Sequence, residues 1–144
     1  MKNNQGLLRC LCFTLVAFCT ATAFTGCGDC KVTGVVTFAD GTPLETGTVC
    51  FENEKANFVG YGMIGKGGRY NLGKTKDGDG IPSGDYSVYV QGAAEIVGRD
   101  AGGSAIYKSL VADKFASPVL SEIKCTVNGK TAFDFQVARP KNSK

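Results

Sequence analysis

The sequence predicts an all-β protein, a seven-stranded Greek-key sandwich of two sheets preceded by a cleaved export signal. Three observations support this fold class. Apolar residues alternate at the period of two that places them on one face of a strand. Turn residues divide these runs at short intervals, and the chain contains 20 glycines. No amphipathic helical pattern extends beyond a few turns, so two packed sheets are the expected architecture.

The first two predicted strands are short runs that stop at turn residues. The run 31–38 is rich in β-branched residues and ends at the turn cluster 40–43. The run 47–51 follows it and places Val49 and Phe51 on one face.

Three further strands are predicted in the middle of the chain, at 58–64, 69–72 and 85–90. The second of these places Tyr70 and Leu72 on a shared face. In the third, apolar residues alternate at every second position, which is typical of a half-buried strand.

The last two predicted strands, 123–127 and 133–137, flank Asn128-Gly129, the strongest two-residue hairpin signal. Between them and the earlier strands, residues 95–121 form a long connection of the kind that is often functional or mobile. Within that connection, one or two helical turns are predicted over 106–115.

The first thirty residues predict export and lipid attachment. Lys2 and Arg9 precede an apolar run, and Gly26-Cys27 follows it, which is typical of a signal peptide that is too short to span a bilayer. The stretch Phe24-Thr25-Gly26-Cys27 resembles the lipobox of bacterial lipoproteins, in which the cysteine is acylated. The alternative is cleavage after Ala23 in the A-x-A pattern, which leaves Cys27 unmodified.

The lipoprotein interpretation predicts four segments. Acyl chains on Cys27 then bind the protein to a membrane at the cell envelope, on the periplasmic or the cell-surface side. The segments are a signal peptide (1–26), a lipidated tether (27–31), a sandwich domain (32–138) and a basic tail exposed to solvent (139–144).

Composition argues against several classes of function. Once Lys2 and Arg9 are removed with the signal, basic and acidic residues nearly balance, so no nucleic-acid partner is expected. The chain has no histidine, the commonest general base and metal ligand. No catalytic residue, metal site or cofactor is therefore predicted, and the protein is expected not to be an enzyme.

Three cysteines remain after the predicted cleavage besides Cys27. Cys30 and Cys125 fall on apolar faces, whereas Cys50 is expected to point outward. An oxidising compartment favours disulfides, and parity favours a bridge between Cys30 and Cys125. Their spacing does not match a zinc or redox motif.

Three other patterns have competing interpretations. Asp77-Gly78-Asp79-Gly80 begins like a calcium loop, but Val88 stands where an EF-hand needs glutamate, so a tight turn is expected. The glycines of 60–68 suggest a phosphate cradle, yet a strand rather than a helix follows them, which favours hairpin and bulge positions. Four tyrosines suggest an aromatic strip that stacks on sugar or peptide, and the alternative is that these tyrosines are half-buried residues of the sandwich. The four are Tyr61, Tyr86, Tyr89 and Tyr107.

A series of strand-and-turn motifs runs from Val32 to Val137. In order, the motifs are Val32-x-Gly34-x-Val36, Gly41-x-Pro43-Leu44, Gly47-x-Val49-x-Phe51, Gly68-x-Tyr70-x-Leu72, Gly78-x-Gly80-x-Pro82-x-Gly84-x-Tyr86-x-Val88-x-Val90, and the late run Lys114-Phe115, Ser117-Pro118, Ser121-Glu122-Ile123. This series resembles the carboxypeptidase regulatory-like, transthyretin-like (prealbumin-type) sandwich, especially in small secreted lipoproteins of planctomycete-type bacteria.

The resemblance implies a non-catalytic accessory, binding or structural module and no particular ligand. Transthyretin-like sandwiches also include a purine-pathway hydrolase that uses histidines and a C-terminal Tyr-Arg-Gly-Ser, neither of which is present here. We therefore expect a membrane-anchored structural or protein-interaction module of the envelope, whose partner is an unknown envelope protein. The alternative is a carbohydrate- or peptide-binding accessory module of the cell surface, which uses the exposed tyrosines and the 95–121 connection.

Overall fold

The computed structural model describes residues 28–141, and the predicted signal peptide, both cleavage sites and Cys27 lie outside this range. The described chain is all-β, with ten strands and two short 3-10 turns, η1 (Lys66–Gly68) and η2 (Asp113–Phe115). Among the described residues, no helix is long and apolar enough to cross a membrane.

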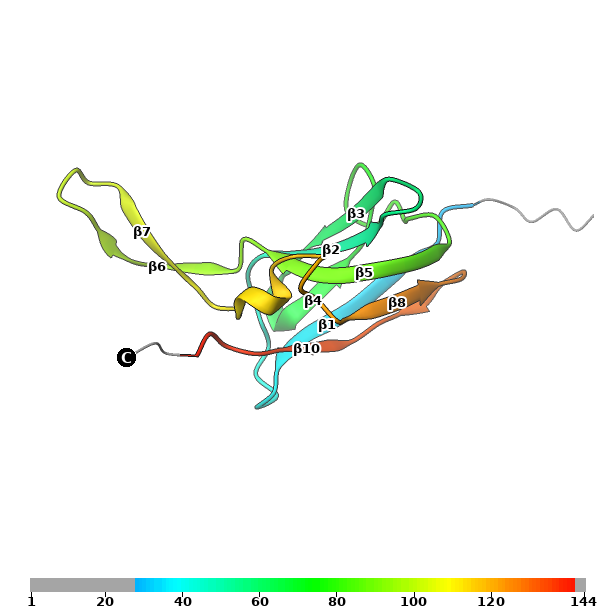
Figure 1. Cartoon of the computed structure of the whole chain (residues 1–144). Helices are drawn as coiled ribbons and strands as arrows, with labels where there is room; N and C mark the ends of the chain where they lie inside the picture. The colour runs from blue at the N-terminus through cyan, green and yellow to red at the C-terminus, as the bar shows by residue number, and fades with distance from the viewer. Residues whose placement is uncertain (1–27, 142–144) are drawn as a thin grey trace, which may run out of the picture.

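The first sheet is built around β1 (Val32–Phe38). β4 (Arg69–Asn71) pairs antiparallel with the first part of β1. On the other side of β1 run two short parallel strands, β9 (Thr131–Ala132) and β10 (Phe135–Val137). The end of the chain thus returns beside its beginning (Figure 1).

The second sheet is antiparallel throughout and has the order β3-β2-β5-β8. Its strands are β2 (Thr48–Asn53), β3 (Phe58–Met63), β5 (Gly84–Gln91) and β8 (Lys124–Val127). β2 lies between β3 and β5, so its inward residues Val49 and Phe51 are completely buried. The period-two alternation of the sequence is the cause, because every second side chain faces the other sheet.

The hydrophobic core lies between these two sheets and contains an aromatic cluster centred on Phe51. Its ring centroid lies 6.4 Å from that of Tyr70, 5.9 Å from that of Tyr86 and 5.9 Å from that of Phe133. Phe51 belongs to the second sheet and Tyr70 to the first, so these contacts join the layers. The observed architecture is therefore an all-β, sandwich-like fold.

Gly34 marks the closest approach inside the first sheet. The Tyr70 hydroxyl donates a hydrogen bond to the carbonyl oxygen of Phe133, directly above Gly34. A Cβ atom at position 34 would lie only 2.0 Å from that oxygen. Glycine is therefore required here because the space is filled, and not because of its backbone conformation.

A third, two-stranded sheet projects from the sandwich. β6 (Ala94–Arg99) and β7 (Ala105–Ser109) form an antiparallel hairpin, which we call the arm. Figure 1 shows the arm extending from the end of the body opposite the N-terminal entry of the chain. β6 pairs only with β7 among the described residues.

Two expectations about the strands require correction. Each of the seven predicted strand runs contains a strand, but the described chain also has β6, β7 and β9. Of the stretch 106–115, the first part is β7 and only Asp113–Phe115 makes a 3-10 turn. The alternating pattern did not reveal the arm because both faces of the arm are exposed to solvent, so no buried face imposes a period of two.

Candidate functional site

The folded body begins at Cys30, three residues after Cys27. Cys30 forms a β-bridge with Ile81, in which the Cys30 amide donates to the Ile81 carbonyl over 2.6 Å. Lys74 forms an ion pair with Asp29 at 2.5 Å, and hydrogen bonding to that carboxylate raises the pKa of Lys74. Cys30 and Lys31, expected in the tether, are therefore part of the folded body.

The three cysteines of the described chain are buried free thiols, so the expected bridge between Cys30 and Cys125 is not formed. The Cys30 sulfur instead accepts a hydrogen bond from the Gly129 amide at 3.2 Å. Both Cys30 and Cys125 belong to the hydrophobic core, as their alternation predicts. Burial raises the pKa of the Cys125 thiol.

Cys50 is the exception to the expected pattern of burial. It lies on the outer face of the second sheet, yet only 4% of its surface is exposed. Tyr61 and Tyr89 are its cross-strand neighbours on β3 and β5, and Tyr89 itself is buried. Desolvation raises the pKa of the Cys50 thiol to about 11. Cys50 therefore points outward as expected, but its large cross-strand neighbours cover its small side chain.

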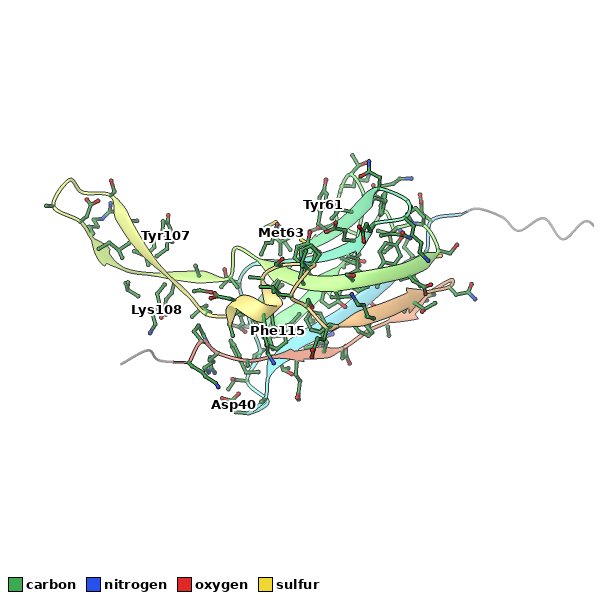
Figure 2. All side chains as sticks on the ribbon, in the orientation of Figure 1. Asp40, Tyr61, Met63, Tyr107, Lys108 and Phe115 are labelled. Atoms are coloured by element: carbon green, nitrogen blue, oxygen red, sulfur yellow. The ribbon has the colours of Figure 1, made fainter. Side chains whose placement is uncertain are left out.

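The four tyrosines do not form one strip. Tyr86 points into the core, where its hydroxyl donates to the Pro82 carbonyl at 2.7 Å. Tyr61 and Tyr89 share the outer face of the second sheet, and Tyr107 lies on the arm. Figure 2 shows Tyr61 beside Met63 and far from Tyr107. A continuous stacking platform of four tyrosines is therefore not present.

The Asp77–Gly80 segment is a turn held together by one carboxylate. Asp79 accepts backbone hydrogen bonds from Lys74, Thr75 and Lys76, the first at 2.7 Å. Desolvation opposes ionisation of Asp79, but these three amides outweigh it and lower its pKa. The carboxylate oxygens are thus occupied by the protein backbone. In the described part of the chain, no group of three or more acidic or cysteine side chains is placed to hold a metal ion.

The glycines of 60–68 lie in strands and turns. Gly60 and Gly62 belong to β3, and β4 begins directly after Gly68. Gly67 and Gly68 both have positive φ angles, 73° and 75°. Gly67 and Gly68 thus lie in a turn, as the sequence favours, but β3 pairs with β2 without a bulge, so Gly60 and Gly62 are positions of close approach and not bulges.

An open groove of about 640 Å³ lies at one end of the second sheet, between the turn after β2 and strands β5 and β8. Two pairs of its polar side chains are bonded to each other. Lys124 donates to the Ser87 hydroxyl at 2.7 Å, and the Thr126 hydroxyl donates to Asp85 at 2.6 Å. The groove therefore offers mixed charge with no set of groups converging on one point.

The first residue of the predicted basic tail is packed on the body. The Arg139 guanidinium lies 3.7 Å from the centroid of the Phe38 ring and 3.3 Å from Asp40. The hydrogen bond from the Thr42 hydroxyl is the main reason that the pKa of Asp40 is lowered. Arg139 therefore contacts the body but remains exposed to solvent, as expected for the tail.

The arm exposes large apolar side chains to solvent. Among the strand residues described, only Met63 of β3 is a more exposed large apolar residue than Tyr107 of the arm. The exposed hydrophobic residues of the arm are Ile96, Val97, Ile106 and Tyr107. A two-stranded hairpin without a supporting layer is only marginally stable in water. Figure 2 shows Tyr107 and Lys108 pointing to opposite sides of the arm. The arm is the candidate interaction site that sequence reasoning left as part of a long connection.

Comparison with known proteins assigns no family. No family model matches the chain, and no curated protein matches it. Among solved structures, a 9R-lipoxygenase from Cyanothece PCC8801 aligns at 15% identity with a TM-score of 0.37. The alignment covers 78% of this chain but only 16% of the lipoxygenase.

Proposed function

We propose that this protein is a bacterial envelope lipoprotein, anchored through acylated Cys27 and acting as a non-catalytic structural or protein-interaction module. Its body, residues 32–138, is proposed to be a transthyretin-like, carboxypeptidase regulatory-like sandwich with Greek-key topology. The observation that carries the proposal is the position of the arm. It extends from the end of the body opposite the N-terminal entry, away from the proposed anchor.

The link between the anchor and the body is very short. Cys30 already pairs with Ile81, so three peptide units separate Cys27 from the sandwich. Three extended residues span at most roughly 10 Å. The body of an acylated protein therefore rests close to the lipid surface, with Asp29 and Gly129 at the end nearest the membrane.

The arm carries its exposed side chains far from that end. β5 begins at Gly84, which pairs with Val127 near the Cys30–Gly129 contact, and runs toward the arm. β6 continues in the same general direction to Arg99 (Figure 1). At about 3.3 Å per residue, residues 84–99 span roughly 50 Å. This reach places an apolar, protein-binding element outside the headgroup layer.

The side chains of the body support a structural role. Asp79 organises a turn, Asp40 binds Thr42 and Arg139, and Tyr86 is hydrogen-bonded inside the core. Each of these polar groups has a partner that explains it structurally. The exposed apolar surface of the arm has no such partner among the described residues.

Replacement of Cys27 tests the anchor. Cys27→Ser in the full chain should abolish incorporation of labelled palmitate and release the protein from the membrane fraction. Cys19→Ser is the matched control, because position 19 lies within the predicted signal and should leave acylation intact. Mass spectrometry of the mature N-terminus provides the second readout. An unmodified terminus at Phe24, or unchanged membrane partition of Cys27→Ser, contradicts the proposal.

A further inference from the structure

The arm has one irregular edge and one regular edge. Pairing of β6 with β7 shifts register between Ile96 and Gly98, which leaves Val97 as an extra residue on β6. Such a bulge increases local twist and makes an edge a poor template for another strand. β7 has no extra residue between Ala105 and Ser109. The outer edge of β7 is therefore the edge on which a further strand can pair.

Hydrogen bonds at the two ends of the arm determine which backbone groups face outward on β7. The Leu110 amide donates to the Ala93 carbonyl over 2.9 Å, and the Asp100 amide donates to the Ser104 carbonyl over 2.9 Å. Hydrogen-bonded and non-hydrogen-bonded pairs alternate along an antiparallel ladder. If this alternation is followed along β7 from Leu110 or from Ser104, the same residues of β7 are found to face outward. Three residues of β7 direct their N–H and C=O groups away from β6: Ala105, Tyr107 and Ser109.

We infer that this outer edge of β7 binds the same edge of a second copy of the chain, in antiparallel orientation and centred on Tyr107. The inference deepens the proposed function, since it names the partner of the interaction element. In this register Tyr107 faces Tyr107 of the second copy, and Ala105 faces Ser109. All of these residues have outward backbone groups, so each facing pair exchanges two N–H···O=C bonds.

The side chains fit this register on one face of the arm. Ile96 and Tyr107 are cross-strand neighbours, and their side chains are 60% and 67% exposed. Pairing centred on Tyr107 joins these two side chains to the same two of the second copy, which gives an unbroken row of four apolar side chains across four strands. Cross-strand aromatic and β-branched pairs of this kind stabilise sheets.

The charges of the arm favour a second copy over a partner of opposite charge. Glu95 and Lys108 are directly opposite each other within one arm. Asp100 and Arg99 balance each other at the tip, so the arm carries no net charge. In the paired register Lys108 lies beside Ile106 of the second copy, where its aliphatic stem covers the apolar side chain. Identical arms therefore meet without net repulsion.

The shape of the molecule permits this contact. A two-fold axis perpendicular to β7 places the two bodies at opposite ends of the pair, because each arm extends away from its own body, so the pair joins copies that are anchored on two facing lipid surfaces. The product is a four-stranded sheet in place of two isolated hairpins. Since three or more strands are needed for independent stability of a sheet, association stabilises the arm.

Cysteine cross-linking of the full chain, solubilised in detergent, tests the register. In the full chain, Tyr107→Cys places two thiols on a hydrogen-bonded pair with Cα atoms about 5.5 Å apart, within the range of a disulfide. Glu95→Cys is the matched control on the same arm, because three strand spacings of about 4.8 Å separate the two copies of position 95. A mild oxidant should give a reducible dimer with Tyr107→Cys only. The three cysteines of the body are buried and should not contribute.

Blocking the edge provides the second test. Ala105→Pro removes an outward N–H and leaves the bonds between β6 and β7 intact, so it should abolish the cross-link at position 107. Ala105→Val keeps the N–H and should preserve it. A parent protein that sediments as a monomer at every concentration tested, an equal yield of dimer from Glu95→Cys, or an adduct of position 107 with a different protein and no dimer overturns the inference.

The two proposals fail in different experiments. If Cys27 is not acylated but the cross-link at position 107 forms, only the anchor is wrong. If Cys27 is acylated and position 107 gives no dimer, only the self-association is wrong.

Discussion

The substitution Gly34→Ala tests how the two ends of the chain meet in the first sheet. The new Cβ atom would lie 2.0 Å from the Phe133 carbonyl oxygen, 2.7 Å from the Phe133 carbonyl carbon and 2.8 Å from the Tyr70 hydroxyl. Two of these atoms are backbone, so no rotamer change relieves the overlap. The Phe133 carbonyl must move by about 1 Å, which separates it from the Tyr70 hydroxyl.

Two costs and one gain determine how much Gly34→Ala changes the free energy of unfolding. Loss of the hydrogen bond leaves a polar group without a partner, which costs about 1–3 kcal/mol. Overpacking adds about 1–3 kcal/mol, and the stiffer unfolded chain of an alanine variant returns about 0.4–1 kcal/mol. We expect a net destabilisation of about 3 kcal/mol, or a fall of roughly 10 °C in Tm for a domain of this size.

Urea unfolding followed by far-UV circular dichroism measures this change, since the chain has no tryptophan. Gly98→Ala is the matched control, because it also lies in a strand and the nearest atom to its added Cβ is 4.0 Å away. We expect that control to stay within about 0.5 kcal/mol of the parent or to gain slightly. In the double variant with Tyr70→Phe, the two costs should be less than additive, by about 0.5–3 kcal/mol. A Gly34→Ala protein as stable as Gly98→Ala refutes the packing argument.

Three further predictions concern the body. The pKa of Asp79 is lower in the folded state, so its contribution to the free energy of unfolding is present above the unfolded pKa and disappears as pH falls below about 4. The stability of Asp79→Ala should therefore fall less steeply with decreasing pH than that of the parent. Asp77→Ala should match the parent. The Cys50 thiol, with its pKa raised to about 11, should resist alkylation at pH 8 until the protein unfolds, and rapid labelling of the native protein in mass spectra would argue against its burial. Phe51→Ala should cost about 3–5 kcal/mol in urea unfolding, because it empties the centre of the aromatic cluster. The exposed Met63→Ala should cost less than about 0.5 kcal/mol, and equal losses for the two variants would exclude this core.

Periodicity predicted the strands of the body well because the body has an interior. Val49 and Phe51 alternate with outward residues, and both are completely buried in β2. The same rule assigned Cys50 to the outer face correctly, but it says nothing about what covers that face, so it did not predict the burial of Cys50. It failed for the arm, where Ile106 and Tyr107 are both exposed on opposite faces.

The candidate interaction site was therefore the least predictable part of the molecule. Sequence reasoning selected Tyr107 for an aromatic strip, together with Tyr61, Tyr86 and Tyr89. Tertiary packing separated these residues, since Tyr86 faces the core and Tyr107 lies on the projecting arm. The one local signal for the arm was the cluster of turn residues at 100–104 between two apolar pairs.

The amino-acid sequence alone determined the strand-rich character of this protein, the positions of its principal turns and the burial of Cys30 and Cys125. These properties depend on residues near one another in the chain, through alternation and turn geometry. Only the tertiary structure decided that Phe133 closes over Gly34, that large neighbours cover Cys50, and that β6 and β7 leave the body as an arm. The first two outcomes depend on contacts between residues distant in sequence, which leave no periodic trace, and the arm has no buried face that would impose one.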